Sequence, residues 1–266
     1  MLCVNHLTIE FHDHSLPETA VDDISFTLKE GEILGIVGES GSGKSMTALA
    51  VAGLLNRGDI KKSGEILWEG KNLLFVDRSE LRNIQGKDIA IVFQDPLTGL
   101  NPLRKIGWQV EEALRVHGER DKMKLREAAI KALADVKLPE PEKIYQMYPH
   151  ELSGGMRQRV MIAAAMICKP KLLIADEPTT ALDVTIQAQI IELLREINQT
   201  ADTAILFISH DLSLVKQLAE RVLVMKDGKI AEEGTVEKIF QNPSAMYTKE
   251  LIAAIPAMLP KGVKNE

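Results

Sequence analysis

Short apolar runs, separated by glycine and charged residues, set the pattern of the first hundred residues. Apolar positions alternate or cluster at Leu7–Phe11, Ile24–Leu28 and Glu65–Trp68, and each run predicts a β-strand. Ile33–Val37 is an apolar run bounded by glycines, as expected for a strand that is buried on both faces. The chain is therefore predicted to open with strands rather than with helices.

Helical periodicity and further strands follow. A helix is predicted from about Lys44 to Leu55, and Val184–Asn198 gathers its apolar positions on one helical face. Other helices are predicted at Glu111–His117, Lys124–Val136 and Ser153–Cys168. Other strands are predicted at Ile89–Phe93, Leu172–Asp176, Ala204–Ser209 and Val222–Lys226. A strand–helix–strand core that is interrupted by helices indicates an α/β fold with a largely parallel sheet.

Composition narrows the class of protein. A length of 266 residues suits one large domain or one domain with an inserted lobe. A formal net charge of −6 and 4% aromatic residues argue against a broad nucleic-acid surface. Cys3 and Cys168 lack the spacing of a zinc site or a disulfide framework. The first residues lack the pattern of a signal peptide, and the longest apolar stretch, Val160–Cys168, is about half of what crosses a bilayer. We therefore expect a soluble chain whose membrane role, if any, depends on partners.

Eight residues match the phosphate-binding pattern GxxxxGK[ST]; they are Gly38-Glu39-Ser40-Gly41-Ser42-Gly43-Lys44-Ser45. Glycines let successive backbone N–H groups turn toward anionic oxygens, and the following helix adds roughly half a positive charge at its N-terminus. We predict that Lys44 reaches the phosphates of ATP and that the Ser45 hydroxyl ligates Mg²⁺. The alternative is a Gly/Ser-rich turn, which the flanking strand and helix disfavour.

Two acidic residues complete this prediction. Asp176 ends the apolar run Leu172–Asp176 and is predicted to hold Mg²⁺ through water. Glu177 comes next and is predicted to polarise an attacking water as a general base. Without the phosphate-binding pattern, two solvated acids at a strand end would be the simpler interpretation.

A segment after residue 150, Leu152-Ser153-Gly154-Gly155-Met156, resembles the signature of ATP-binding cassette (ABC) proteins. Gln94 lies in a segment similar to the Q-loop, Thr180-Ala181-Leu182-Asp183 resembles the D-loop, and Ser209-His210-Asp211 resembles the H-loop. The resemblance implies an α/β P-loop NTPase cassette with a RecA-like parallel-sheet core, an N-terminal antiparallel β subdomain and an inserted α-helical subdomain. It places the cassette at 1–255, the helical insert at approximately 95–169 and a flexible tail at 256–266.

The resemblance also implies roles for single residues. Gln94 contacts Mg²⁺ or the attacking water, and His210 contacts the γ-phosphate. The signature residues Ser153, Gly154, Gly155 and Met156 face the ATP of a second cassette, so that two cassettes close over shared sites. Asp183 is assigned to the D-loop. Each role has a simpler structural alternative: Ser153 can be a helix N-cap, Gln94 a strand-end amide and His210 a hydrogen-bonded strand-end histidine.

Two departures from the family pattern affect ATP contacts. Met46 stands where many cassettes have Ser or Thr, so the contact to the α-phosphate is expected to involve the Met46 backbone or to move to Thr47. The segment before the second strand also lacks an aromatic residue to stack on adenine, because Phe11 is already in a strand. His14 and Leu16 are the candidates there.

Three segments resemble peptide and nickel importers; they are Phe93–Pro102, Asp176–Gln187 and Tyr247–Leu251. In that subfamily a second, usually different cassette pairs with the first beneath two membrane permease subunits, and an extracytoplasmic binding protein delivers the cargo. Several peptide importers carry a cysteine-rich C-terminal segment for an iron–sulfur cluster, and this sequence has no such cysteines. The shorter form resembles nickel or metal-chelate importers, and peptides remain the alternative cargo.

The resulting expectation is an ATP-hydrolysing subunit that energises bacterial import, peripheral to the cytoplasmic face of the cell membrane, with ATP and Mg²⁺ as ligands. The alternative is a soluble ABC ATPase that acts in DNA or ribosome processes. One cassette, no long heptad tract and an acidic balance disfavour that alternative, and no nucleic-acid partner is expected.

Overall fold

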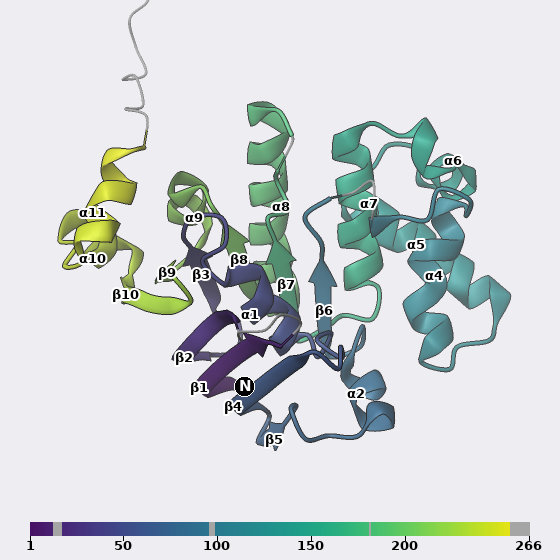
Figure 1. Cartoon of the computed structure of the whole chain (residues 1–266). Coiled ribbons are helices and arrows are strands. Elements are labelled where there is room, and N and C mark those ends of the chain that lie inside the picture. The colour runs from purple at the N-terminus through teal and green to yellow at the C-terminus, as the bar shows by residue number, and fades with distance from the viewer. Residues whose placement is uncertain (13–17, 96–98, 181, 256–266) are drawn as a thin grey trace, which may run out of the picture.

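Two β-sheets and a lobe of helices make up the described part of the chain (Figure 1). The computed structural model describes residues 1–12, 18–95, 99–180 and 182–255. The antiparallel N-terminal sheet has the strand order β2-β1-β4-β5. Its strands are β1 (Leu2–Phe11), β2 (Glu18–Leu28), β4 (Ile60–Trp68) and β5 (Lys71–Asn72).

The second sheet is parallel except at one edge. Its order is β10-β9-β3-β8-β7-β6, and only the β10–β9 pair is antiparallel. The strands are β3 (Ile33–Val37), β6 (Ile89–Val92), β7 (Leu172–Asp176), β8 (Ala204–Ser209), β9 (Arg221–Lys226) and β10 (Lys229–Thr235). Parallel neighbours end at the same edge of a sheet, so the segments after β3, β8, β7 and β6 follow one another in space.

Apolar residues cover both faces of the parallel sheet. In β7, Leu172 and Ile174 pack with α1 (Lys44–Val51) and the antiparallel sheet, whereas Leu173 and Ala175 pack on the other side. That other side carries α8 (Val184–Ala201) and α9 (Leu212–Leu218). Every residue of β3, β7 and β8 is buried, which confirms the expectation of strands covered on both faces.

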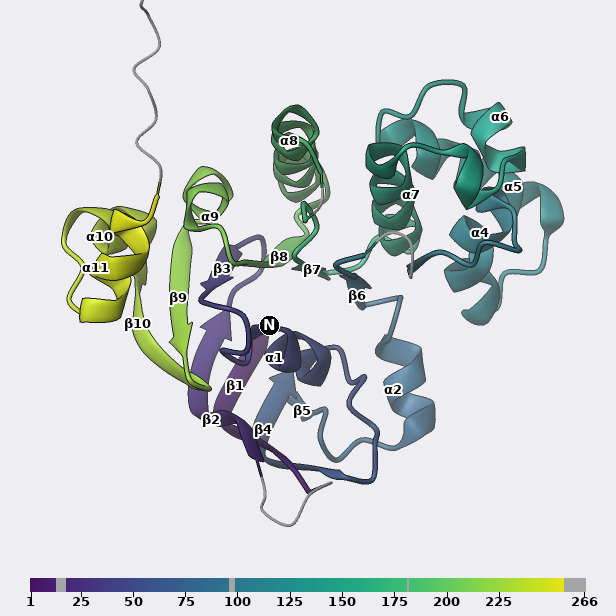
Figure 2. The same cartoon turned by 45° about the horizontal axis from the view of Figure 1, so that its top comes forward.

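A lobe of helices lies beside β6, at the opposite end of the molecule from β10 (Figures 1 and 2). It comprises α4 (Ile106–Val116), α5 (Lys122–Asp135), α6 (Pro141–Gln146), a 3₁₀ turn (Pro149–Glu151) and α7 (Gly154–Met166). α4, α5 and α7 contact one another, and Val110, Ala129 and Val160 lie in their shared core. The described helices α4 to α7 thus form an insert between β6 and β7 of the parallel sheet.

The helix expected from Lys44 to Leu55 ends early, at Val51. Gly53 has a φ of +69°, and Leu54 N–H donates to the Leu49 carbonyl while Gly53 N–H donates to that of Ala50. This pair of bonds is the Schellman motif, in which a left-handed glycine terminates a helix. The sequence contains the signal, because Gly53 lies within the predicted range, two residues after Val51.

Several short elements were not anticipated. They are α2 (Arg78–Ile84), α6, α9, α10 (Val236–Gln241), α11 (Met246–Ala253), β5 and β10. α2 and α9 carry recognisable caps: the Asp77 carboxylate accepts from Ser79 N–H, and Asp211 accepts from Ser213 N–H. Helices of six to eight residues give too few turns for periodicity to identify them.

The other predicted elements are present, with shifts at their ends. β3, β7 and β8 begin and end where predicted. Both cysteines, Cys3 and Cys168, are free thiols. Within the described ranges, none of the helices combines the length and apolar composition that a membrane span requires. The tail expected at 256–266 lies outside the described residues.

Candidate functional site

The predicted site residues follow the carboxyl ends of four neighbouring strands. The phosphate-binding loop follows β3, His210 follows β8, Asp176 ends β7, and Gln94 lies two residues beyond β6. The strand order therefore sets these side chains in one row along a single edge of the sheet. Ligands of open α/β sheets bind at this edge.

The loop after β3 requires glycine at Gly43. This residue has a φ of +98°, and a Cβ atom there would lie 2.6 Å from the Ala20 carbonyl oxygen. A side chain at Gly43 would meet both backbone strain and a steric clash. Gly43 directly precedes α1, so the loop delivers its backbone to the N-terminus of a helix.

The Lys44 ammonium lies inside this loop. Its Nζ donates to the carbonyls of Gly38 at 2.8 Å and Glu39 at 2.7 Å, and it approaches Ser42 Oγ at 3.4 Å. Burial lowers the pKa of Lys44, while the nearby carboxylates of Glu177 and Asp176 act in the opposite direction. A buried cation that is held by loop carbonyls is poised to exchange them for anionic oxygens.

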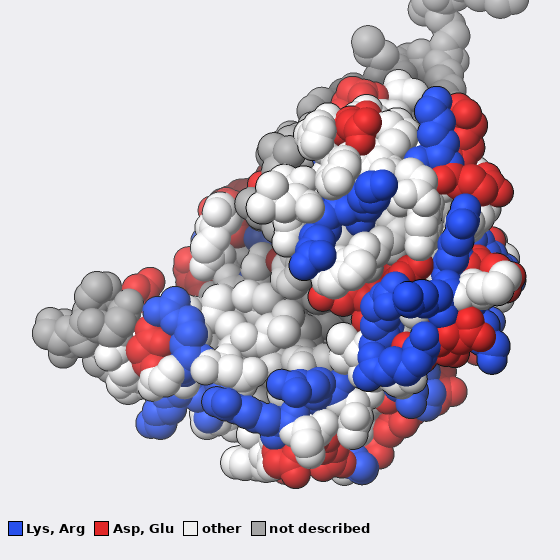
Figure 3. Space-filling model, turned by 90° about the vertical axis from the view of Figure 1, so that its right-hand side faces the viewer, with Lys and Arg blue, Asp and Glu red and all other residues white. Residues whose placement is uncertain are grey.

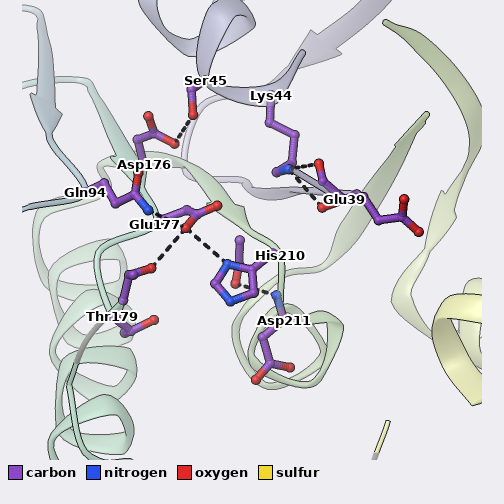
Figure 4. A network of polar contacts seen from close by, with 12 residues as sticks. Glu39, Lys44, Ser45, Gln94, Asp176, Glu177, Thr179, His210 and Asp211 are labelled. Atoms are coloured by element: carbon purple, nitrogen blue, oxygen red, sulfur yellow. Dashed lines mark hydrogen bonds and ion pairs between the residues drawn. The ribbon is translucent and has the colours of Figure 1, made fainter. Parts of the chain in front are cut away.

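Ser45 and Asp176 are in direct contact. Ser45 Oγ donates to Asp176 Oδ1 at 3.0 Å (Figure 4). Burial raises the pKa of the Asp176 carboxyl, and the Ser45 hydrogen bond partly offsets this effect. A hydroxyl and a carboxylate side by side are hard oxygen donors of the kind that Mg²⁺ prefers. No cluster of three or more His, Cys, Asp or Glu side chains suited to a metal occurs in the described part of the chain.

Three side chains of the site contact the Glu177 carboxylate. Its Oε2 lies 2.9 Å from Gln94 Nε2, 3.0 Å from Thr180 Oγ1 and 3.1 Å from His210 Nδ1. Figure 4 shows Gln94 and His210 pointing toward this carboxylate from opposite sides. Glu177 has a φ of +46°, an uncommon conformation for a residue with a side chain, and its N–H donates to the Ile208 carbonyl. The backbone turns sharply after β7 and so presents the carboxylate to its neighbours.

A cavity of about 770 Å³ opens over this arrangement. The predicted residues that line it are Gly38, Glu39, Ser40, Gly41, Gly43, Lys44, Ser45, Met46, Gln94, Glu177 and His210. The structure thus brings the loop, the Q-loop amide, the acid and the histidine to one cavity. Its size accommodates a nucleotide-sized ligand.

The structure does not bring Thr47 to this cavity. The Thr47 hydroxyl donates to the Gly43 carbonyl at 3.0 Å, and the side chain is fully buried in α1. Met46 lines the cavity instead. Whether the α-phosphate contact moves to Thr47 or is made by the Met46 backbone stays a prediction, and the place of Met46 at the cavity favours the backbone alternative. Ser42 is also buried, beside Lys44.

The adenine-contacting candidates His14 and Leu16 lie outside the described residues. Glu18, Thr19 and Ala20, at the start of β2, line the cavity and are the described neighbours of that segment.

Sequence reasoning missed three further neighbours of the site: Thr180, Leu251 and Tyr247. Thr180 was quoted only as part of the D-loop, and the other two lie in α11, far away along the chain.

The signature residues are not part of this cavity. Ser153 caps α7, because its Oγ accepts from Met156 N–H at 3.3 Å; this is the N-cap of the simpler alternative, and the role toward a second cassette stays a prediction. Ser153 and Gly154 are also exposed, whereas Gly155 and Met156 are half-buried. The exposed end of α7 therefore remains available to another molecule.

Asp183 is the N-cap of α8 and is likewise exposed. Its Oδ1 accepts from Ile186 N–H at 3.0 Å. A Cβ atom on Gly155 would lie 2.8 Å from Ile186 Cγ2, so the N-termini of α7 and α8 pack closely there. Ala181 of the D-loop lies outside the described residues, as do Pro96, Leu97 and Thr98 after the Q-loop.

The sequence of this chain is similar to those of known proteins. The sequence model of the family described as ABC transporter matches residues 21–180. The dipeptide transport ATP-binding protein DppD of Escherichia coli K12 is 48% identical over 256 residues, which is 96% of this chain and 78% of that protein. The oligopeptide transport ATP-binding protein OppD of Haemophilus influenzae is 50% identical over 259 residues, which is 97% of this chain and 80% of that protein.

A solved structure supports the same relationship. The ATP-binding cassette MJ0796, in a dimeric post-hydrolysis state bound to ADP and Pi, is similar with a TM-score of 0.79 and 29% identity. The match covers 89% of this chain and 99% of that one. The cassette fold expected from the sequence is therefore confirmed.

Proposed function

The chain belongs to the ABC transporter family, and from this premise we propose that it is the ATP-hydrolysing subunit of a bacterial importer for dipeptides or oligopeptides. One observation carries the catalytic part of this proposal: Gln94, Thr180 and His210 converge on a single oxygen of Glu177 at the cavity that the phosphate-binding loop lines. The transport part rests on the names and the identity of the peptide-transport relatives.

Each residue has a defined task in this function. Lys44 and the N–H groups of the loop and of the first turn of α1 bind the phosphates of ATP. Glu177 accepts a proton from the attacking water, while Gln94 and His210 hold its carboxylate in place. His210 is 58% exposed at the cavity, so its outer ring nitrogen is free to reach a γ-phosphate oxygen.

Mg²⁺ fits the oxygen donors at Ser45 and Asp176, with the Gln94 amide oxygen as a further ligand. When bound, the ion neutralises charge that develops on the phosphates. The chain holds these two donors close together before any ion binds. The 3.0 Å contact between Ser45 Oγ and Asp176 Oδ1 joins the start of α1 to the end of β7.

Hydrolysis in this proposal requires a second cassette. Ser153 and Gly154 are exposed and do not line the cavity of their own chain, which supports a role toward the ATP of a partner. The similar cassette MJ0796 was solved as a dimer. Its dimeric state and the exposed N-caps Ser153 and Asp183 together support paired, composite sites.

A groove beside the helical lobe suits the membrane subunits. It has a volume of about 390 Å³ and lies between β6, α4 and α7, with Phe93, Ala113 and Val116 among its lining residues. Figure 3 shows this side of the molecule, where uncharged side chains form a hollowed area with Lys and Arg along part of its border. We assign the groove to permease subunits, which would keep the chain at the cytoplasmic face of the membrane.

Peptides are favoured over nickel as the cargo. The nickel expectation depended on the lack of a cysteine-rich segment, whereas DppD and OppD relatives are named for dipeptides and oligopeptides. A soluble role in DNA or ribosome processes gains no support from these names.

Reconstituted transport tests the proposal. The chain, a partner cassette and two permease subunits are placed in lipid vesicles with the binding protein, and ATP-dependent uptake of a labelled dipeptide, a labelled oligopeptide and Ni²⁺ is measured. Uptake of either peptide that disappears with Glu177→Gln is the expected result. Uptake of Ni²⁺ alone would overturn the assignment of peptides as the cargo. ATP hydrolysis without uptake of any of the three cargoes would overturn the proposed function as an importer.

A further inference from the structure

The C-terminal helix α11 reaches the ATP site. Tyr247 and Leu251 are four residues apart and so lie on one face of α11. Tyr247 is only 7% exposed, and Leu251 lines the nucleotide cavity. Neither residue has a task in the mechanism above, although the sequence marks the segment as a subfamily feature.

The Tyr247 hydroxyl contacts the phosphate-binding loop directly. It accepts a hydrogen bond from the Glu39 backbone N–H at 3.0 Å, across 208 positions of sequence. The Lys226 ammonium lies 4.7 Å from the centre of the tyrosine ring, at the end of β9. Burial and this cation–π contact hold the ring, so the hydroxyl is presented to Glu39 from a fixed position.

A buried carboxylate fixes the start of α11. Glu232, in β10, accepts from the Ser244 N–H and hydroxyl at 2.7 Å each and from the Ala245 N–H at 3.0 Å. These donors lie directly before Met246, where α11 begins. Because β10 pairs with β9 and β9 pairs with β3, α11 is anchored to the same sheet from which the loop emerges.

The contacts that Lys44 makes inside the loop are exchangeable, so a contact from outside the loop helps to hold the backbone there. An ammonium group has three donors, and Lys44 directs its Nζ at three loop acceptors, the carbonyls of Gly38 and Glu39 and the hydroxyl of Ser42. A phosphate oxygen must displace at least one of them. Two hydrogen bonds reach the loop from outside and do not involve Lys44: Gly228 N–H donates to the Ser42 carbonyl, and Glu39 N–H donates to the Tyr247 hydroxyl.

We propose that Tyr247 is a positioning residue of the ATP site, which holds the Glu39 peptide in place while Lys44 exchanges loop carbonyls for phosphate. The inference rests on the proposed role of the loop in binding ATP. It assigns to the Tyr247–Leu251 segment a task in nucleotide binding: Tyr247 fixes the loop, and Leu251 forms part of the cavity wall. Tyr247 acts through the loop and does not touch the reacting atoms.

Tyr247→Phe tests this role, because it removes the hydroxyl and keeps the buried ring. Binding of the fluorescent analogue mant-ATP to the purified full chain and steady-state ATP hydrolysis by the assembled transporter are measured. We expect Kd and the KM for ATP to rise about three- to tenfold, the loss of roughly one hydrogen bond. The kcat is expected to stay within about twofold, since the Glu177 cluster is unchanged.

Tyr145→Phe is the matched control. It also removes a tyrosine hydroxyl, but this one donates to Glu111 in the helical lobe. The control is expected to change thermal stability and leave Kd for mant-ATP unchanged. A general loss of stability would therefore not imitate the effect of Tyr247→Phe.

Glu232→Gln is the second test, because it loosens the start of α11 without altering Tyr247. A rise of Kd in the same direction is expected. Unchanged Kd in both variants overturns the positioning role, and a fall of kcat at unchanged KM for Tyr247→Phe overturns it too. If the wild-type chain itself binds no mant-ATP, the proposed function fails instead.

Discussion

The side-chain amide of Gln94 donates to the carboxylate of Glu177, with 2.9 Å between Nε2 and Oε2 and 83 positions between the residues. Gln94 directly precedes the segment that leads into the helical lobe, and Glu177 directly follows the strand that leads out of it. One hydrogen bond thus joins the proposed base to the root of the lobe. The Glu177 carboxylate is therefore in direct contact with the segment that enters the lobe.

Glu177→Gln is expected to leave mant-ATP binding intact and to lower phosphate release by about 10²- to 10⁴-fold. The amide keeps the shape of the carboxylate but accepts no proton. Glu192→Gln, at an exposed position of α8, is the control and should hydrolyse ATP at the wild-type rate. Turnover of Glu177→Gln close to wild type would remove Glu177 from the role of base.

Gln94→Ala is expected to lower kcat about 10- to 100-fold, because the Glu177 carboxylate loses a donor that orients it. The concentration of Mg²⁺ for half-maximal turnover is expected to rise as well, since the amide oxygen is a proposed ligand. Steady-state hydrolysis across a series of Mg²⁺ concentrations measures both. An unchanged Mg²⁺ requirement would confine Gln94 to orienting Glu177.

Gly155→Ala is expected to destabilise the chain by about 1–3 kcal/mol, because its Cβ atom would lie 2.8 Å from Ile186 Cγ2. Removing that methyl group with Ile186→Ala creates room for it. Urea unfolding should therefore show a smaller penalty for Gly155→Ala in the Ile186→Ala background. Equal penalties in both backgrounds would mean that the two helix ends do not press on each other.

Glu232→Gln is expected to cost about 1–3 kcal/mol at neutral pH, because three donors lose a charged acceptor. Burial acts to raise the pKa of Glu232, but the hydrogen bonds from Ser244 and Ala245 outweigh it and lower the pKa from its ordinary 4.5 to about 2. A carboxylate whose pKa is lowered by folding stabilises the folded state at pH values above its unfolded-state pKa. This contribution to stability is lost as the pH falls through the folded-state pKa.

The stability gap between wild type and Glu232→Gln should therefore narrow as pH falls from about 5 toward about 2. Urea midpoints at each pH measure it. Glu127→Gln, at an exposed position of α5, is the control and should show no such gap. A gap that stays constant with pH would mean that the Glu232 charge contributes nothing.

Val116→Glu is expected to weaken assembly with the permease subunits about tenfold or more, because it places a charge in the apolar groove. Co-purification of tagged chain with the membrane subunits measures it, and mant-ATP binding should be unchanged. Met123→Glu, on an exposed apolar residue of the lobe outside the groove lining, is the matched control. Equal recovery of complex for both variants would remove the groove from the docking surface.

The strand ends of the site could be predicted because each is a local pattern. The apolar runs ending at Val37, Asp176 and Ser209 match β3, β7 and β8, and the phosphate-binding loop follows the first of them. The early end of α1 could also have been predicted from the sequence. Gly53 adopts a left-handed conformation and terminates α1 about one turn before the predicted end.

The convergence on Glu177 could not be predicted from the residues alone. It depends on the strand order β3-β8-β7-β6, which no local pattern encodes, and on the left-handed turn at Glu177. The approach of Tyr247 to Glu39 is beyond local patterns for the same reason, since it needs α11 folded back on the sheet. The role of Thr47 stays a prediction: its position in the motif suggests a ligand contact, whereas its hydroxyl donates to the Gly43 carbonyl in this structure.

The three acceptors around the Lys44 ammonium also bear on product release. The carbonyls of Gly38 and Glu39 accept from Lys44 donors that a phosphate would take, so ATP in this proposal has to displace contacts within the loop. The affinity for ATP is then the difference between the phosphate contacts and the loop contacts that they replace. When a phosphate leaves, the same carbonyls lie within reach of the ammonium, so product release need not leave a buried cation without acceptors.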